Sequence, residues 1–321
     1  MGLLHAGIMN TVPECKLQAI CDSDSMICRW ARRVIPGVRF YTGLGEMLEK
    51  ESLDSVHVTT PLWSHQSVIV DLFNYDNKVN VFCEKPLALD YAQALSIANR
   101  TRAHSGETMV GYQKRFCGTF EYAHKILEEG VLGELTKFNS HFYTNDVTRP
   151  SKGPKFAPGT GGVSIDFMPH LVDLLLWYFG KPRWVDPIAK RIVSKEVEDS
   201  VHATLGYGYG LAGTLDVSWS APGFNIPELA IDVQGLNGQL RVTEDALELR
   251  LVNSKTNSRY ESGTFYAHAL TATPKFLISR PELALEDEYF VEHIRHGSHP
   301  RNNFVQAAEV NFMIDEIRNK F

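Results

Sequence analysis

Residues 53–86 decide the fold class of this chain. Residues 53–61 (LDSVHVTTP) and 78–86 (KVNVFCEKP) are short apolar runs that end in turn-forming residues, which is typical of buried strands. Residues 65–74, which lie between them, have the pattern of a helix. A strand, a helix and a second strand in this order predict a right-handed βαβ unit and therefore a parallel sheet.

The same alternation of strands and helices runs from residue 16 to residue 112. It predicts a Rossmann-type, doubly wound parallel sheet, and we expect residues 1–112 to form a dinucleotide-binding domain. The other strands of this domain are predicted at residues 16–22, 38–43 and 108–112, and its other helices at residues 25–34, 44–50 and 89–104.

The pattern changes after residue 112. A helix is followed by a long alternating strand at residues 134–146, and Gly-containing turns separate several further strands, which is typical of an antiparallel sheet. Residues 113–321 are therefore predicted to form an α+β domain with a largely antiparallel open sheet. Its helices are predicted at residues 119–129, 163–179, 285–297 and 303–320, and its other strands at 201–220, 229–233, 238–243 and 246–251.

Composition excludes several classes of protein. The chain has 32 Lys and Arg against 38 Asp and Glu, a net charge of −6, which disfavours nucleic-acid binding because that function requires a basic face. No apolar run approaches the ~20 residues that span a bilayer, and no basic segment precedes an apolar one as in a secretory signal. The five cysteines are an odd number without a C-x-x-C pair, so we expect free thiols and a cytoplasmic location.

The carboxyl ends of parallel strands form the ligand-binding edge of such a sheet. Asp22 ends the first predicted strand, 20 residues after Gly2, and is placed to accept hydrogen bonds from the ribose of NAD and to repel the 2′-phosphate of NADP. An aspartate in a turn or at a helix N-cap is the alternative interpretation.

A second candidate segment follows the strand at residues 53–61. The backbone at Thr60 and Pro61 is placed to face a nicotinamide ring, with Trp63 against it and His65 at the start of the next helix. Ordinary packing is the alternative for Trp63.

The third candidate is the tripeptide Glu84-Lys85-Pro86 at the end of a strand. A partly buried lysine beside a cationic nicotinamide ring is suited to proton transfer. Neighbouring Glu and Lys residues are common, so the tripeptide alone is a weak signal.

Together these stretches resemble a known family. The segments TTPLWSHQ (59–66) and VNVFCEKPLALD (79–90) resemble the Gfo/Idh/MocA family of nicotinamide-dependent oxidoreductases, and VGYQKRF (110–116) and GGVSIDFMPHLVDLLLW (161–177) match in the expected order. The resemblance implies that Lys85 is catalytic and contacts the substrate, that Arg115 contacts the substrate, and that Asp166 and His170 form a D-x-x-x-H motif. It further implies that residues 113–321 bind the substrate and form a homodimer or homotetramer.

Asp166 and His170 suit catalysis on their own terms as well. They are four residues apart, so on a helix they share a face, and a carboxylate can orient a histidine that takes a proton at neutral pH. A surface pair without function is the alternative. No metal site is predicted, since His293, His296 and His299 have no partner at ligand spacing and fit a solvated helix end.

The dinucleotide fingerprint is incomplete at the N-terminus. Gly2 corresponds to its last glycine and His5 to the histidine that follows, but the first strand and two earlier glycines are absent. Because that strand is central in a doubly wound sheet, we expect the natural protein to have about ten further N-terminal residues.

These features predict an enzyme that transfers a hydride between NAD(H), less favourably NADP(H), and a hydroxyl or carbonyl carbon of a polyol, sugar or sugar derivative. Two alternatives remain open, both known in the family that the chain resembles. One is a glycosidase that uses NAD for a transient oxidation, and the other is a non-catalytic regulator that senses a nucleotide.

Overall fold

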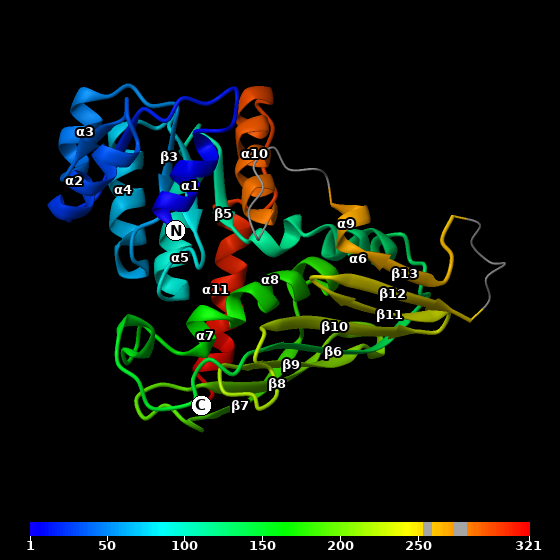
Figure 1. Cartoon of the computed structure of the whole chain (residues 1–321). Helices are drawn as coiled ribbons and strands as arrows, with labels where there is room; N and C mark the ends of the chain where they lie inside the picture. Colours follow the sequence, from blue (N-terminus) through cyan, green and yellow to red (C-terminus); the bar gives the residue numbers. More distant parts are fainter. Residues whose placement is uncertain (253–258, 272–280) are drawn as a thin grey trace. The chain divides into compact units, whose positions relative to one another are not determined.

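The computed structural model describes residues 1–252, 259–271 and 281–321, which form two compact units (Figure 1). The chain passes from the first unit to the second between Gly111 and Tyr112, beside the predicted domain boundary. Part of the C-terminal segment, which we expected in the second domain, belongs to the first unit. The first unit comprises Met1–Ala88, Ala92–Gly111 and the described part of Pro274–Ala308; the second comprises Leu89–Tyr91, the described part of Tyr112–Thr273, and Glu309–Phe321.

Hydrophobic burial explains why the C-terminal segment returns to the first unit. Helix α10 (Pro281–His296) packs against helix α1 (Gly2–Met9), where Leu283 and Ala284 are buried with Ile8. This contact joins residues at the two ends of the chain, so the order of elements along the sequence does not predict it.

The first unit contains the predicted parallel strands, each shorter than expected. Strands β1 (Ala19–Cys21) and β2 (Arg39–Tyr41) pair in parallel, and β3 (Ser55–Val58), β4 (Asn80–Glu84) and β5 (Thr108–Gly111) form a three-stranded parallel sheet. The Rossmann-type class is confirmed. The strands form two sheets rather than one, and in the described part of the chain no strand pairs with both β1 and β3.

The helices of the first unit follow its strands as predicted. Helix α2 (Ser25–Val34) begins where the Asp24 carboxylate accepts the Met26 N–H at 2.7 Å, and it buries Cys28 and Ala31 against Phe40. The remaining helices of this series are α3 (Leu44–Lys50), α4 (His65–Tyr75) and α5 (Tyr91–Thr101).

The second unit is built on an eight-stranded sheet. Its neighbouring strands are antiparallel except for β6 and β9, which are parallel, so the sheet is mixed rather than a simple meander. The predicted strand 201–220 is two strands joined by a tight turn in which the Tyr207 N–H donates to the Leu211 oxygen. In spatial order the strands are β13 (Gly263–Tyr266), β12 (Ala246–Leu251), β11 (Gly238–Thr243), β10 (Glu228–Gly235), β6 (Leu135–Tyr143), β9 (Ala212–Ser218), β8 (Ser200–Gly206) and β7 (Trp184–Lys190).

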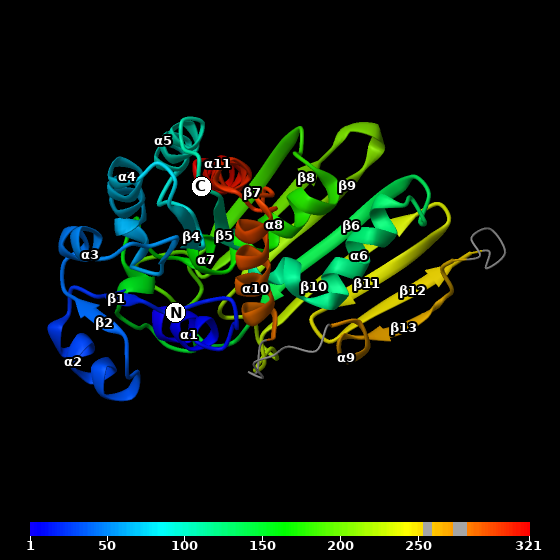
Figure 2. The ribbon, with the colours of Figure 1, turned by 90° about the horizontal axis from the view of Figure 1, so that it is seen from above.

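Helices α6 (Gly118–Glu128) and α8 (Met168–Phe179) lie along one face of this sheet (Figures 1 and 2). The aromatic rings of Phe138 and Phe142 on β6 stack on Phe179 and Phe167 at centroid distances of 4.6 and 4.1 Å. The helices therefore cover a hydrophobic core. The shorter helices are α7 (Val163–Asp166) and α9 (Ala267–Leu270), and α11 (Phe304–Arg318) ends in this unit.

The helix predicted at residues 163–179 is divided. Helix α7 ends at Asp166, α8 begins at Met168, and Pro169 occupies the first turn of α8. Since proline has no N–H to bond the carbonyl four residues earlier, the hydrogen-bonded ladder is interrupted at this point.

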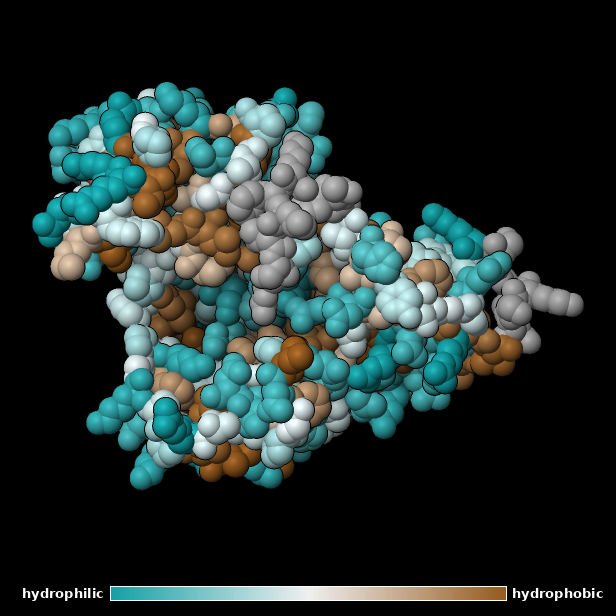
Figure 3. Space-filling view, in the orientation of Figure 1, coloured by the Kyte–Doolittle hydropathy of each residue, from teal (hydrophilic) through white to brown (hydrophobic). Residues whose placement is uncertain are grey.

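Hydrophilic side chains cover most of the face that Figure 3 shows, with apolar surface interspersed over the first unit. In the described ranges, no helix has both the length and the apolarity that crossing a bilayer requires.

Candidate cofactor and active site

In the first unit, His65 joins the loops that follow β3 and β4. Its Nε2 lies 2.9 Å from the Thr60 carbonyl oxygen and its Nδ1 3.1 Å from that of Pro86. The ring is 1% exposed, and burial lowers the pKa of His65 despite these two acceptors. His65 is therefore a buried link that holds the Thr60 and Lys85 loops side by side, rather than an exposed cofactor contact.

The loop after β3 presents a large aromatic ring to solvent. Trp63 lies in a short 3₁₀ turn (Leu62–Ser64) and is 56% exposed, and its neighbours Thr60 and Pro61 are exposed too. Packing within the unit does not account for an exposed tryptophan at the carboxyl edge of a parallel sheet. A role of Trp63 in binding a planar ring stays a prediction.

Helix α1 begins at this same edge. A Cβ atom on Gly2 would lie 2.8 Å from the Thr59 Oγ1, so glycine lets the helix start approach the residue after β3 without displacing that hydroxyl. The N-terminal turn of a helix carries unpaired N–H groups and attracts phosphate. The first unit thus offers an anion-binding turn where a dinucleotide would need one.

Asp22 directly follows β1, as predicted. Its Oδ1 accepts the N–H of Asp24 at 2.8 Å, so one carboxylate oxygen shapes the turn before α2. Asp22 therefore does stabilise a turn, as the alternative interpretation predicted. Ribose binding by Asp22 stays a prediction.

Glu84 ends β4 with both carboxylate oxygens engaged. Its Oε1 lies 2.9 Å from the Nε2 of His5, and its Oε2 accepts the N–H of Lys85 at 3.1 Å. The peptide bond between Lys85 and Pro86 is cis, and the Lys85 side chain is half-buried. Glu84 thus contacts α1 through His5, and a cofactor contact by Glu84 stays a prediction.

His5 is the centre of a buried ion network that joins α1, β4 and α10. Its Nδ1 lies 3.0 and 2.9 Å from the two carboxylate oxygens of Asp287, and the Nε2 of His57 on β3 lies 3.4 Å from Asp287. Burial by itself lowers the pKa of His5, but the hydrogen bonds to Asp287 and Glu84 outweigh it and raise this pKa to about 10. Burial opposes ionisation of Asp287 and Glu84 too, yet their bonds to His5 lower both pKa values. The network is ionised at neutral pH.

Sequence reasoning missed Asp287 and gave His5 no role. The available signal was an acidic pair, Glu286 and Asp287, inside the apolar face of a helix that buries Leu283 and Phe290. Glu286 is fully buried, neither of its oxygens has a hydrogen-bond partner among the residues that the structure describes, and burial raises its pKa.

Among the residues described, His5, His57 and Asp287 are spaced so that a metal ion could be held, with ligand atoms within 4.8 Å of one another. In the structure His5 contacts the carboxylates of Asp287 and Glu84 through its two ring nitrogens. His299, which we weighed as a metal ligand, contacts Glu107 at 3.0 Å.

The network predicts a characteristic pH dependence of stability. His5 has a folded pKa of about 10, above its unfolded value of about 6.5, so its contribution is complete below pH ~6.5 and is lost as the pH rises toward 10. The raised pKa of Glu286 acts in the same direction, whereas the lowered pKa values of Asp287 and Glu84 predict a loss in acid. Urea unfolding between pH 6 and 10 should show the free energy of unfolding falling with pH.

His5→Gln should flatten that alkaline decline. His202→Gln is the matched control, because His202 pairs with Asp216 at 2.6 Å in the second unit and is 44% exposed. An alkaline slope of the same size in His5→Gln and the unaltered chain would contradict the assignment.

The second unit carries Asp166 at the end of α7 and His170 in the first turn of α8. His170 is 7% exposed, and its ring lies edge-on to Phe142 at a centroid distance of 6.0 Å. The start of α7 is held by Glu198, whose carbonyl accepts the Val163 N–H at 3.0 Å and whose carboxylate accepts the N–H and hydroxyl of Ser164. This contact sets the position of the D-x-x-x-H segment.

Arg115 is paired inside the second unit. It lies in a 3₁₀ turn (Gln113–Phe116), is 7% exposed, and donates to the Asp173 carboxylate from Nε at 2.8 Å and from Nη2 at 2.6 Å. Burial raises the pKa of Asp173 although Arg115 opposes the shift. Asp173 thus belongs to a buried network, and a substrate contact by Arg115 stays a prediction that would require this pair to open.

Replacing one partner of the Arg115–Asp173 pair should lower the free energy of unfolding more than replacing both partners. Arg115→Met leaves a buried carboxylate without a cation, and we expect a loss of ~3–5 kcal/mol in the free energy of unfolding. Adding Asp173→Leu removes the stranded charge and should recover part of that loss. Chemical unfolding of the two single variants and the double variant measures this, and additive losses would contradict it.

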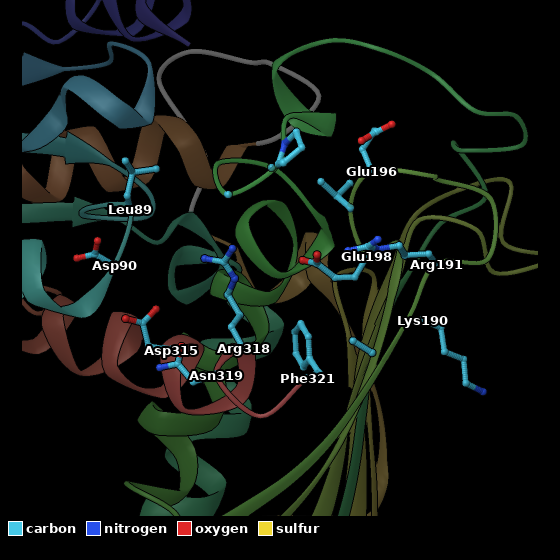
Figure 4. A pocket seen from close by; sticks show the side chains of 15 residues that line it. Leu89, Asp90, Lys190, Arg191, Glu196, Glu198, Asp315, Arg318, Asn319 and Phe321 are labelled. Carbon is cyan, nitrogen blue, oxygen red and sulfur yellow. The ribbon is translucent and has the colours of Figure 1, made fainter.

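A cavity of about 640 Å³ lies in the second unit, near the loop before α7 (Figure 4). In Figure 4 the Arg318 side chain extends into it, with Glu198 and Arg191 on one side and Asp315 and Asp90 on the other. Within the described ranges, neither Asp166 nor His170 lines this cavity.

Two family models match the chain. Residues 1–112 match the model of an oxidoreductase family with an NAD-binding Rossmann fold, and residues 120–241 match the GFO/IDH/MocA C-terminal domain.

Curated proteins and solved structures show the same similarity. An uncharacterised oxidoreductase of Schizosaccharomyces pombe is 30% identical over 181 residues, covering 55% of this chain and 48% of that protein. The 2,7-anhydro-N-acetylneuraminate hydratase of Escherichia coli is 25% identical over 295 residues, covering 82% and 76%. The chain thus spans about half the length of the fungal relative. A levoglucosan dehydrogenase, solved with NADH and levoglucosan, superposes with a TM-score of 0.85 at 18% identity, covering 99% and 92%, which shows a common fold.

Proposed function

Because the chain belongs to the GFO/IDH/MocA family of oxidoreductases, we propose that it transfers a hydride between NAD(H) and a CH–OH carbon of a sugar, polyol or sugar derivative. The observation that carries the proposal is the edge of the first unit. There the start of α1, the Thr60 loop and the Lys85 loop lie together in a domain that matches an NAD-binding model.

The residues at this edge fit a dinucleotide. We assign the pyrophosphate to the N-terminal turn of α1 at Gly2, the adenosine ribose to Asp22, and the nicotinamide to the segment from Thr60 to Trp63. NAD, when bound, supplies the acceptor for the hydride. Asp22 disfavours NADP, since its carboxylate would repel a 2′-phosphate.

Three side chains are assigned to the chemistry by the family motif. In the direction of oxidation, His170 removes the hydroxyl proton and Asp166 holds its ring in the tautomer that accepts it. Lys85 donates a hydrogen bond to the oxygen, where negative charge develops. A homodimer or homotetramer stays a prediction from the family resemblance.

A screen for NAD reduction over sugars, sugar acids and inositols tests the proposal. We expect one group of chemically related substrates to yield NADH, detected at 340 nm, with NADP reduced more slowly. Asp22→Ala should bring the rates of NAD and NADP reduction closer together. Binding of NAD without turnover of any compound would contradict the enzyme assignment and favour a nucleotide-sensing regulator.

A reaction without net redox change is the second candidate, and the hydratase among the relatives favours it. In that case a sugar substrate would be converted while NADH does not accumulate. Product analysis by mass spectrometry, beside the absorbance assay, separates the two functions.

A further inference from the structure

We propose that His5 is a positioning residue that fixes Lys85 through the Glu84 carboxylate; this inference rests on the proposed role of Lys85. The connection runs through the Glu84 carboxylate, which contacts His5 through one oxygen and the Lys85 N–H through the other.

Two short contacts join His5 to the backbone of Lys85 through Glu84. His5 Nε2 lies 2.9 Å from Glu84 Oε1, and the Lys85 N–H donates to Glu84 Oε2 at 3.1 Å. β4 ends at Glu84, so Lys85 is the first residue of the loop that follows the strand. The same carboxylate fixes the backbone at Lys85.

His5 is itself held so that it cannot rotate away. Its other ring nitrogen lies within 3.0 Å of both oxygens of Asp287, and Asp287 is fully buried, with the Nε2 of His57 3.4 Å from its Oδ1. The rings of His57 and Phe82 stack at a centroid distance of 4.7 Å and close the network from the side of the sheet. Elements α1, β3, β4 and α10 therefore all bear on the position of Glu84.

Accurate placement is what a reacting lysine requires. A shift of ~1 Å in a catalytic group can cost ~10²-fold in rate. The loss of one hydrogen bond lowers the free energy of unfolding only modestly. A residue that controls the placement of Lys85 should thus lower kcat more than its effect on folding accounts for.

Two nearly isosteric variants of His5 separate positioning from stability. The amide nitrogen of Gln falls close to the histidine Nε2, so His5→Gln keeps a donor for Glu84 and loses Asp287. The amide nitrogen of Asn falls close to Nδ1, so His5→Asn keeps Asp287 and loses Glu84. Each variant loses one buried partner, and both should be destabilised to a similar degree.

We expect His5→Gln to keep kcat within ~10-fold and His5→Asn to lose ~10²-fold, with the substrate KM changed far less than kcat. A second readout needs no cofactor. Reductive methylation of the chain, followed by peptide mass spectrometry, should show a changed rate at Lys85 in His5→Asn, with the rate at the exposed Lys50 unaltered. Equal effects of the two variants on kcat and on Lys85 reactivity would overturn the inference.

Matched controls complete the design. His104 is a histidine of the same unit whose Nε2 lies 2.8 Å from the Val79 oxygen, remote from Glu84, and His104→Gln and His104→Asn should leave kcat unchanged. If His5→Asn does not fold, Glu84→Gln tests the same connection, since it weakens both bonds of Glu84 and leaves His5 on Asp287. Full turnover in Lys85→Ala would instead contradict the proposed role of Lys85 itself, which keeps the two failures distinct.

Discussion

Lys85→Ala and His170→Ala should each lower kcat by ~10²-fold or more while the chain still folds. The physical reason is that each removes an interaction that strengthens only as the hydroxyl proton leaves. Without Lys85 the developing negative charge on oxygen loses its donor, and without His170 the proton has no acceptor. Steady-state kinetics with the substrate found in the screen measure both effects.

The double variant adds a test that requires no assumption about how the two units are arranged. If Lys85 and His170 serve the same step, their effects should be strongly non-additive, and the double variant should be little worse than the poorer single one. Lys50→Ala and His202→Ala are the matched controls, both at exposed ion pairs, and should keep full rates. Turnover retained in both Lys85→Ala and His170→Ala would contradict the catalytic roles assigned to Lys85 and His170.

Asp199→Ala should cause a large loss of stability in the second unit, similar to that of Arg115→Met. Asp199 is fully buried and its carboxylate accepts three backbone N–H groups, from Ile192 at 2.7 Å and from Val193 and Ser194 at 2.6 Å each. Alanine leaves these donors without a partner, at ~1–3 kcal/mol for each one that water does not reach. We expect a total of ~3–5 kcal/mol, measured as the free energy of unfolding.

This loss should also reach the D-x-x-x-H segment, because the neighbouring Glu198 holds the start of α7. Asp199→Asn is the closer replacement and should cost less, since one amide oxygen still accepts. Asp216→Ala removes a half-buried carboxylate of β9 and serves as the control. Similar unfolding curves for Asp199→Ala and Asp216→Ala would show that the three bonds do not matter.

Local patterns predicted the elements that lie near one another in sequence. The structure contains the strands predicted at 53–61 and 78–86 and the helix between them, as β3, β4 and α4. These elements were predictable because apolar periodicity and turn-forming residues are local features of the sequence. The E-K-P and D-x-x-x-H motifs were visible for the same reason. The break at Phe167 was missed although Pro169 marks it, since the apolar pattern continues across it.

Contacts between distant residues were not predictable in this way. His5 and Asp287 are 282 positions apart, and Arg115 and Asp173 are 58 apart, so no periodicity relates them. The family motif predicts a substrate contact for Arg115, and only the structure shows that Arg115 is buried and paired with Asp173. The parallel pairing of β6 with β9 likewise depends on which strands meet in the sheet.

The amino-acid sequence by itself determined the α/β class, the family and the candidate residues Lys85, Asp166 and His170, because these depend on short-range patterns and motifs. Only the tertiary structure decided that α10 belongs to the first unit and that Glu84 is held by His5. The physical reason is that burial and electrostatic pairing depend on which side chains meet in space, and a buried charge takes whatever partner the fold brings to it.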